Sequence, residues 1–297
     1  MYADIAHNKR RTWVLIGVMS TFVIGLSWLI GAMNGVDASS SIIAGTLIAT
    51  IYSLISYYAS SSIALSVSGA KPIQKSQAPE LFTVVENLCI ANGQPMPKVY
   101  IMDEKSPNAF ATGRDPEHAS VAFTTGLLAL LTKEELEGVA AHELSHIKNY
   151  DIRVMTIVVV LVGLISLIAD ILIHTHIFRG SDDDSKSAGL LMIAGIALAI
   201  LSPLFAQIIQ LAVSRSREYL ADASGALLTR YPDGLASALE KIAAHGTPMQ
   251  HANHATAHLF FSNPFGATAE TRSFFTNLFA THPPMEERVK RLRSMGR

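Results

Sequence analysis

Four long apolar blocks interrupt this chain of 297 residues and limit what it can fold into. They cover residues 13–33, 41–59, 154–172 and about 190–211, and each is close to the length that a helix needs to cross roughly 30 Å of hydrocarbon. With 49% hydrophobic and only 16% charged residues, the chain is too apolar for a single soluble domain of ordinary composition. The blocks therefore predict a mainly α-helical membrane protein with two transmembrane helical hairpins.

The first and last blocks each leave an alternative open. Basic residues at positions 9–11 precede the first block and resemble the start of a signal peptide. The block exceeds the roughly 7–15 apolar residues of such a peptide, and the second block follows almost at once, which favours a retained hairpin. Pro203, Gln207 and Gln210 weaken the fourth block. A partly buried core helix there, and hence two spans rather than four, is the fallback.

The distribution of Lys and Arg indicates the orientation, because the cytoplasmic flanks of membrane helices are enriched in both. The basic residues 9–11 precede the first block, whereas the link at 34–40 has none. The N-terminus is therefore expected in the cytoplasm. Paired spans return the C-terminus and both soluble parts to the same side, whether the spans number two or four.

Three short segments between the hairpins have the composition of strands. Residues 98–102 and 120–124 are rich in β-branched and aromatic side chains, and 108–112 is a third candidate, so a small sheet is expected. Thr132 and Glu135 then match a capping box, in which each side chain binds a free amide at the start of a helix. That helix is expected to run from residue 133 to about 150.

A His-Glu-Leu-Ser-His motif at positions 142–146 lies inside this predicted helix. His142 and His146 are four residues apart, so they share one helical face and can hold one metal ion between their imidazoles. Glu143 projects beside that face, where it can take a proton from a water at the metal without being a ligand. Because Cys89 is the single cysteine, only His and carboxylate side chains can complete the site.

A catalytic zinc takes three protein ligands, so a third ligand is required elsewhere. Glu218 is the candidate, and Asp222 shares its helical face, where it can accept a hydrogen bond from the free ring nitrogen of a liganding histidine. The alternative is a solvated acidic pair beside Arg215 and Arg217. The motif precedes the third apolar block and Glu218 follows the fourth, each by about two helical turns. The legs of the second hairpin would then join the ligands near the membrane surface.

At these residues the chain resembles the HtpX family of bacterial and archaeal membrane zinc proteases, distant relatives of the enzymes that trim prenylated proteins. The resemblance covers nearly the whole chain. It rests on segments in a matching order: the N-terminal hairpin, PNAFATG at 107–113, the 142–146 motif, the second hairpin, residues 218–222 and THPP at 281–284. It implies a zincin-like α+β metalloprotease domain that binds one zinc ion per chain.

The resemblance also implies residue roles. His142, His146 and Glu218 are zinc ligands, Glu143 is the base, and Asp222 supports a ligand.

Three further roles follow from the resemblance alone. It places Asn108 along the substrate backbone, and His282 with Arg288 where negative charge develops on the carbonyl oxygen, a role that requires donors aimed at the oxyanion. Taken without the resemblance, Asn108 is typical of a turn residue after Pro107, and His282 of a cap before a helix that starts at Pro283.

These observations divide the chain into four parts. Residues 1–70 are the cytoplasmic tail and first hairpin, 71–153 the first part of the cytoplasmic catalytic domain with the zinc-binding helix, 154–211 the second hairpin, and 212–297 the second part with the third ligand. The resemblance implies a bacterial inner membrane or archaeal cell membrane. It further implies quality control of misfolded or damaged membrane proteins during stress, with other membrane quality-control proteases as candidate partners.

Other functions fit the sequence less well. A protease that cuts within the bilayer would carry the motif inside an apolar span, whereas Lys133, Glu134, Lys148 and Asp151 surround it here. A metal transporter or an inactive zinc scaffold would carry polar or ionisable residues inside its spans, and besides the two glutamines of the fourth block only Asp170 near a span end qualifies. A net charge of −1 without any Lys/Arg run argues against nucleic acid as a partner.

Two further groups of histidines invite a second metal site. His251, His254 and His258 have helical spacing, but their neighbours favour a polar, mobile segment. The histidines at 174–176 and the acidic run at 182–184 are expected in a solvated extracytoplasmic loop, where weak ion binding stays open.

Overall fold

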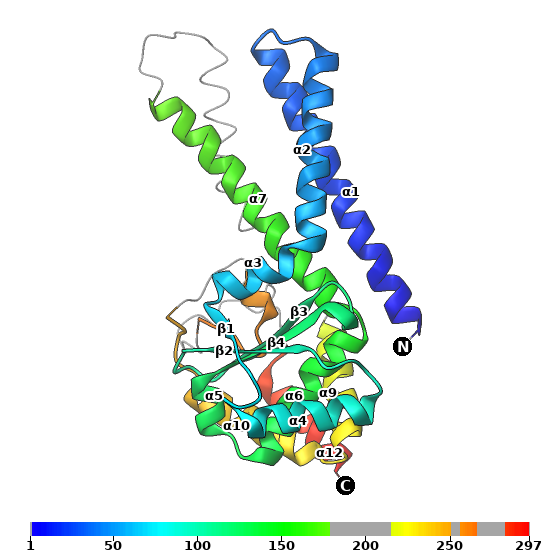
Figure 1. Ribbon diagram of the computed structural model, residues 1–297, viewed down its shortest axis with the longest axis vertical. Helices are drawn as coiled ribbons and strands as arrows, with labels where there is room; N and C mark the ends of the chain where they lie inside the picture. The colour runs from blue at the N-terminus through cyan, green and yellow to red at the C-terminus, as the bar shows by residue number, and fades with distance from the viewer. Residues whose placement is uncertain (1, 179–214, 251–255, 266–282, 297) are drawn as a thin grey trace.

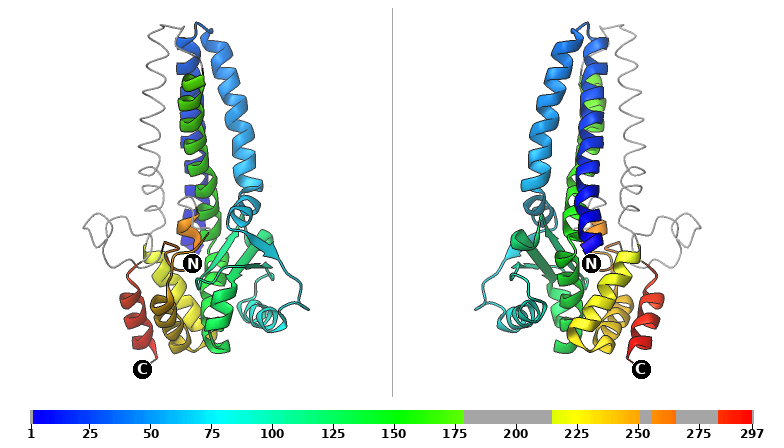
Figure 2. Two further views of the ribbon diagram at one scale, coloured as in Figure 1. Left: turned by 90° about the vertical axis from the view of Figure 1, so that its left-hand side faces the viewer. Right: turned by 90° about the vertical axis from the view of Figure 1, so that its right-hand side faces the viewer.

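The computed structural model describes residues 2–178, 215–250, 256–265 and 283–296. Three long helices, α1 (Tyr2–Met33), α2 (Ala38–Tyr58) and α7 (Asp151–Phe178), extend from one end of a body of shorter helices around one small sheet (Figures 1 and 2). The C-terminus lies at the opposite end of the body (Figure 1). A mainly helical fold with a small sheet is therefore confirmed.

The two N-terminal apolar blocks form α1 and α2, as predicted. The carboxylate of Asp37 caps α2, because it accepts hydrogen bonds from the backbone N–H groups of Ser39 and Ser40. Among the described residues, two helices are long and apolar enough to cross a membrane, over Ile5–Ala32 and Ala38–Tyr58. α1 begins well before the predicted block, so the basic residues 9–11 are helical too.

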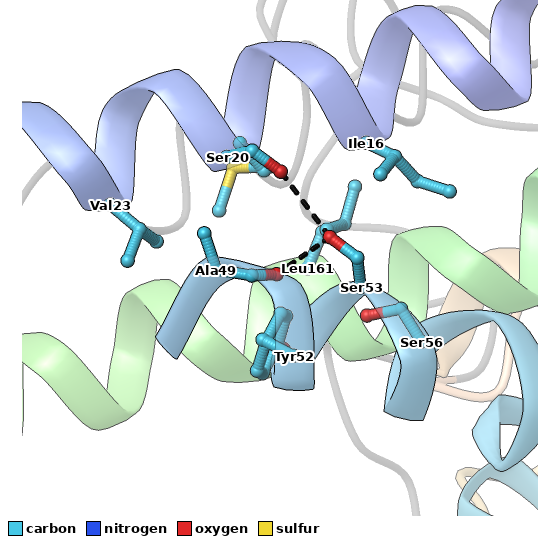
Figure 3. A pocket seen from close by; sticks show the side chains of 9 residues that line it. Ile16, Ser20, Val23, Ala49, Tyr52, Ser53, Ser56 and Leu161 are labelled. Carbon is cyan, nitrogen blue, oxygen red and sulfur yellow. Dashed lines mark hydrogen bonds between the residues drawn. The ribbon is translucent and has the colours of Figure 1, made fainter. Parts of the chain in front are cut away.

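Helix α7 covers the third apolar block and packs against both N-terminal helices. Figure 3 shows this contact, which leaves a cavity of only about 10 Å³, close to the smallest volume that holds one water. Beside the cavity, the hydroxyl groups of Ser20 and Ser53 lie 3.2 Å apart and join α1 to α2. The fourth block, residues 190–211, lies outside the described residues, so the second hairpin stays a prediction.

The body contains one four-stranded mixed sheet with the strand order β1-β2-β4-β3. β2 (Lys98–Met102) and β4 (Ala119–Thr124) are parallel, and β1 (Ala70–Pro72) and β3 (Ala109–Gly113) are antiparallel edge strands. The three predicted strands are confirmed to within one residue at either end. β1 was not among them, because three residues that end in proline carry no strand pattern and form a strand by pairing with β2.

Helix α6 (Lys133–Lys148) carries the histidine motif, and its predicted capping box is confirmed, since Thr132 and Glu135 each bind the other's backbone amide. α6 contacts β3, α4 (Pro79–Asn92), α9 (Arg215–Thr229) and α10 (Pro232–His245). Two glycines allow close approach. A Cβ on Gly138 would lie 2.8 Å from the backbone of Leu235 in α10, and one on Gly225 of α9 would lie 3.1 Å from the backbone nitrogen of His142.

The remaining described elements are short. They are α3 (Ser60–Val67), α5 (Thr125–Leu130), α12 (Met285–Met295), and the 3-10 helices η1 (Pro116–His118) and η2 (Ala257–Leu259). The main core contains side chains that precede α7 in the sequence, such as Phe123 and Leu144, and others that follow it, such as Leu239 and Leu292. Segments from both sides of α7 thus build one core, which holds α6 and α9 side by side.

Candidate metal centre

Helices α6 and α9 bring the three predicted ligands together. His142 and His146 lie one turn apart on α6, and Glu218 lies in the first turn of α9. Their donor atoms lie within 4.8 Å of one another. Glu218 Oε1 is 3.5 Å from His146 Nε2, and Glu218 Oε2 is 3.8 Å from His142 Nε2. The alternative of a solvated acidic pair is wrong, because Glu218 and Asp222 are only 2% and 3% exposed.

The second ring nitrogen of His142 faces a buried ion pair. His142 Nδ1 lies 2.9 Å from Asp222 Oδ1. Arg288 of α12 donates to both oxygens of Asp222, over 2.8 Å from Nε and 2.7 Å from Nη2. A carboxylate that binds a guanidinium in this two-pronged way is fixed in orientation, and it fixes the orientation of the imidazole in turn.

His146 has a comparable partner that the motif does not include. His146 Nδ1 lies 3.1 Å from Oδ2 of Asp151, the first residue of α7. The other carboxylate oxygen of Asp151 accepts hydrogen bonds from Asn8 Nδ2, over 2.7 Å, and from Arg217. Tyr150 adopts a positive φ of 60° between the two helices, and this sharp turn aims Asp151 back at the histidine.

The surroundings give the two imidazoles opposite proton affinities. Burial lowers the pKa of His142 to about 4. Burial also opposes a charged His146, but the hydrogen bond to Asp151 and the charge of Glu218 outweigh it and raise the pKa of His146 to about 9. Burial, aided by the charge of Glu218, raises the pKa of Glu143 to about 7. Near neutral pH, His146 therefore holds a proton and Glu143 can exchange one.

The donor chemistry fits a divalent metal ion. Asp222 and Asp151 accept from the two Nδ1 atoms, so both Nε2 atoms are left to face each other, 3.1 Å apart. Two imidazole lone pairs and a carboxylate that converge in a buried space repel one another unless a proton or a cation lies between them. Two histidines and one glutamate are a ligand set of catalytic zinc sites.

Glu143 lies between the cluster and the edge strand β3. Its side chain is 2% exposed and accepts a hydrogen bond from the backbone of Ala111 in β3. Phe261 covers the cluster from another direction, with its ring centre 4.9 Å from that of His142 and 4.8 Å from the guanidinium carbon of Arg288. Phe261 lies in an irregular segment after η2, and nothing in the local sequence marks it as part of the site.

Asn108, at the start of β3, binds the backbone of the same segment. Its Nδ2 donates to the carbonyl of Ser262 over 2.9 Å, and its Oδ1 accepts from the N–H of Ser262 over 3.0 Å. The next contact continues like a strand pair, since the N–H of Phe261 donates to the carbonyl of Ala109 over 2.8 Å. Asn108 is thus a buried pairing residue at the sheet edge and more than a turn residue.

Of the two residues predicted to face the carbonyl oxygen, Arg288 is among the described residues and His282 is not. Arg288 is fully buried, and its Nη1 lies 3.8 Å from Glu218 Oε2 with no hydrogen-bond partner among the described residues. His282 lies outside the described residues.

The histidine-rich segment differs from its prediction where it can be followed. His258 is buried in η2 with Nε2 2.7 Å from the carbonyl of Met155, so this position is not part of a polar, mobile segment. His251 and His254 lie outside the described residues.

A paired-histidine helix beneath the edge strand of a mixed sheet, with a buried glutamate from a second helix beside both imidazoles, is typical of a metallopeptidase. Comparison with known proteins agrees. The model of Peptidase family M48 matches residues 75–296. Proteins named "Protease HtpX homolog" are 47% identical in Tropheryma whipplei strain Twist, over 100% of this chain and 99% of that protein, and 45% identical in Dictyoglomus turgidum, over 99% and 95%.

The chain therefore belongs to peptidase family M48 and, within it, to the HtpX proteases. It is a membrane-associated metalloendopeptidase, and its family implies a divalent metal ion. The crystal structure of S. mikatae Ste24p shares the fold, with a TM-score of 0.51 and 22% identity over 95% of this chain and 66% of that one.

Proposed function

We propose that this chain is a zinc endopeptidase that hydrolyses polypeptides on the cytoplasmic side of a cell membrane. His142, His146 and Glu218 hold one zinc ion per chain, and Glu143 is the general base. The observation that carries the proposal is the convergence of three buried donors within 4.8 Å, with a fourth buried group, Glu143, beside them. Asp222 supports the site by orienting His142.

The reaction is metal-assisted hydrolysis of a peptide bond. When bound, the zinc ion polarises the scissile carbonyl and makes a water acidic near neutral pH. Glu143 takes the proton from that water and delivers it to the leaving amine, and a pKa of about 7 suits a group that first accepts and then donates.

Arg288 is assigned to the negative charge that develops on the carbonyl oxygen. Its buried Nη1, without a hydrogen-bond partner among the described residues, is a donor that such a charge can engage. His282 is assigned the same role, on the family resemblance.

Asn108 is assigned to the substrate backbone. Its amide already pairs with both backbone groups of Ser262, so it is oriented for an extended peptide. A substrate would have to take over these two hydrogen bonds.

The cytoplasmic placement rests on the chain's own charge distribution. The basic residues 9–11 lie at the end of α1 that adjoins the body, as Figure 1 shows. Two hairpins, over 1–70 and 154–211, would then anchor the two parts of the catalytic domain, over 71–153 and 212–297, with both termini in the cytoplasm. A reporter fused after Arg297 should behave as cytoplasmic, and an extracytoplasmic signal would overturn this topology.

Quality control of misfolded or damaged membrane proteins is the biological role that we propose, with other membrane quality-control proteases as partners. Two observations support it. The chain is kin to the HtpX proteases, and the site lies on a body that is joined directly to the apolar helices α1, α2 and α7. A trap experiment addresses the substrates, because membrane proteins that accumulate on a Glu143→Gln enzyme but not on the wild type are its clients.

The central test compares zinc content with peptide cleavage in the full chain in detergent micelles. Glu143→Gln should retain one zinc ion and lose cleavage of an unfolded protein by roughly 10²–10⁴-fold, because the base is removed while the ligands stay. Glu134→Gln, an exposed position on the same helix, is the matched control and should keep both properties. Unchanged turnover in Glu143→Gln would remove Glu143 from the mechanism. Full zinc content in Glu218→Ala would reject Glu218 as a ligand.

A further inference from the structure

Asp151 joins the metal centre to the first helix of the chain. We propose that Asp151 is a positioning residue for His146 and that Asn8, on the apolar helix α1, holds Asp151 in place, so that the seating of a membrane helix sets the metal affinity of the peptidase. This inference rests on the metal site proposed above. It adds two residues to that site, one of them 143 positions away in the sequence.

The two carboxylate oxygens of Asp151 have separate tasks. Oδ2 faces His146 Nδ1 at 3.1 Å, and Oδ1 accepts from Asn8 and Arg217. The carboxylate is 2% exposed, and a buried carboxylate is stable only while it is paired and hydrogen-bonded. A carboxylate held from one side and bound to a ligand's free ring nitrogen on the other fixes the orientation of that ligand.

Asn8 is placed to hold the whole turn between α6 and α7. Its Nδ2 donates to Asp151 over 2.7 Å and to the backbone carbonyl of Asn149, the residue that ends α6, over 2.8 Å. Lys9 reaches the same turn, with Nζ 4.6 Å from the ring centre of Tyr150. α1 therefore contacts both residues between α6 and α7, and also the first residue of α7.

Residues 7–11 of α1 are held against the body by polar contacts more than by close apolar packing. Asn8 is fully buried, and a buried amide is stabilising only while it is hydrogen-bonded. A cavity of about 300 Å³ borders the contact, with His7, Arg11 and Arg217 among the residues that line it, so apolar packing is incomplete here. Arg217, which shares Asp151 with Asn8, directly precedes Glu218 in α9. The contact thus gathers α1, α7 and α9 beside two of the three proposed ligands.

The experiment measures zinc affinity of the full chain in detergent micelles by competition with a fluorescent zinc chelator, together with the melting temperature of metal-stripped protein. It is run at about pH 9, where a proton on His146 competes little with zinc. Asp151→Asn and Asn8→Leu should weaken zinc binding, the former by roughly 10–100-fold, as for other residues that orient a liganding histidine. Thr12→Val is the matched control. Thr12 is equally buried one turn along α1, but its hydroxyl bonds the backbone of Asn8 within the same helix. It should leave zinc affinity within twofold of wild type.

The exchanged pair Asn8→Asp with Asp151→Asn separates positioning from simple structural support. The exchange keeps one amide and one carboxylate in contact but presents the amide to His146. We expect zinc affinity to stay low, because a neutral amide is a weaker acceptor than a carboxylate. The melting temperature should recover in part and not fully, because a carboxylate at position 8 cannot donate to the carbonyl of Asn149. Full recovery of zinc affinity in the exchanged pair would overturn the positioning role of Asp151.

The remaining outcomes test the role of Asn8 and distinguish this inference from the proposed function. Wild-type affinity in Asn8→Leu, or an equal loss in Thr12→Val, would reject a specific contribution of Asn8. If the wild-type chain itself bound no zinc and cleaved no peptide, the proposed function would fall first. If it bound one zinc ion and cleaved normally while the variants matched it, only the present inference would fail.

Discussion

His142 and His146 lie one turn apart on the same helix, yet the side chains that hold them come from different parts of the chain. Asp222 and Arg288, from the C-terminal helices of the body, hold His142. Asp151 holds His146, and it depends on a donor from the apolar helix α1. One imidazole is thus held from the core of the body, whereas the other is held from the apolar helices α1 and α7.

The two sides also differ in charge. Both carboxylates bind an arginine, but Arg288 binds Asp222 through two nitrogens and is fully buried, whereas Arg217 binds Asp151 through one nitrogen. On the His142 side, burial keeps the imidazole neutral. On the His146 side the carboxylate favours a protonated imidazole. The stability of the fold should therefore depend more on the His142 side. The pH dependence of metal binding should depend more on the His146 side.

The largest effect on stability should come from removing the ion pair between Arg288 and Asp222 on the His142 side. Arg288→Met leaves the carboxylate of Asp222 buried without its partner, which costs about 3–5 kcal/mol of unfolding free energy. Denaturant unfolding of the metal-free chain, followed by circular dichroism, measures the loss. Lys290→Met, an exposed position on the same helix, should change stability by less than about 0.5 kcal/mol. Equal stability of the two variants would show that this ion pair does not anchor the body.

The pH dependence of zinc binding should separate the two sides next. His146 has a raised pKa, so it is protonated below about pH 9 and must release that proton when metal binds. Loss of one proton predicts an affinity that falls roughly 10-fold for each pH unit, or about 100-fold from pH 8 to pH 6. Calorimetry in buffers of different ionisation enthalpy counts the proton. Asp151→Asn removes the main cause of the raised pKa and should flatten the profile, and an unchanged slope would contradict this assignment.

Asp222→Asn should weaken zinc binding by roughly 10–100-fold, because the hydrogen bond that orients His142 loses its charge. Chelator competition gives the value. The slope of the pH profile should persist in this variant, since the proton in question is held by His146. A flattened slope in Asp222→Asn would mean that the released proton is not held by His146 alone.

The smallest effect concerns a feature that both sides share. Thr132→Ala removes the side-chain cap of α6 and should cost about 1 kcal/mol of stability. The ratio of the zinc-binding losses caused by Asp151→Asn and Asp222→Asn should not change in this background. A change in that ratio would mean that the start of α6 influences one histidine more than the other.

The sequence predicts those features that depend on neighbours along the chain. The β-branched and aromatic content of residues 98–102 and 120–124 predicts two strands, with 108–112 as a third candidate, and Thr132 with Glu135 predicts the start of α6. Both signals act within a few residues. The spacing of His142 and His146 brings the two imidazoles onto one face for the same reason. The prediction of Glu218 as the third ligand needed one more assumption, that the second hairpin returns the chain to the two histidines.

Contacts between distant segments could not be predicted from local pattern. Asn8 and Asp151 each look like an ordinary polar residue at the edge of an apolar block, and only folding brings them together. Phe261 packs on His142 from a segment without regular structure. His258 has polar neighbours in the sequence, yet it is buried with its Nε2 against a backbone carbonyl of α7.

Gly225 has no side chain, and its lack of one sets the distance between the helices that carry the three proposed ligands. The missing methyl group lets the main chain of α9 rest against the main chain of α6 at His142. Closely packed main chains shift much less than side chains, which can rotate. An ion of different radius would thus be accommodated by rotation of the imidazoles and the carboxylate, while the distance between the two helical backbones stays constant.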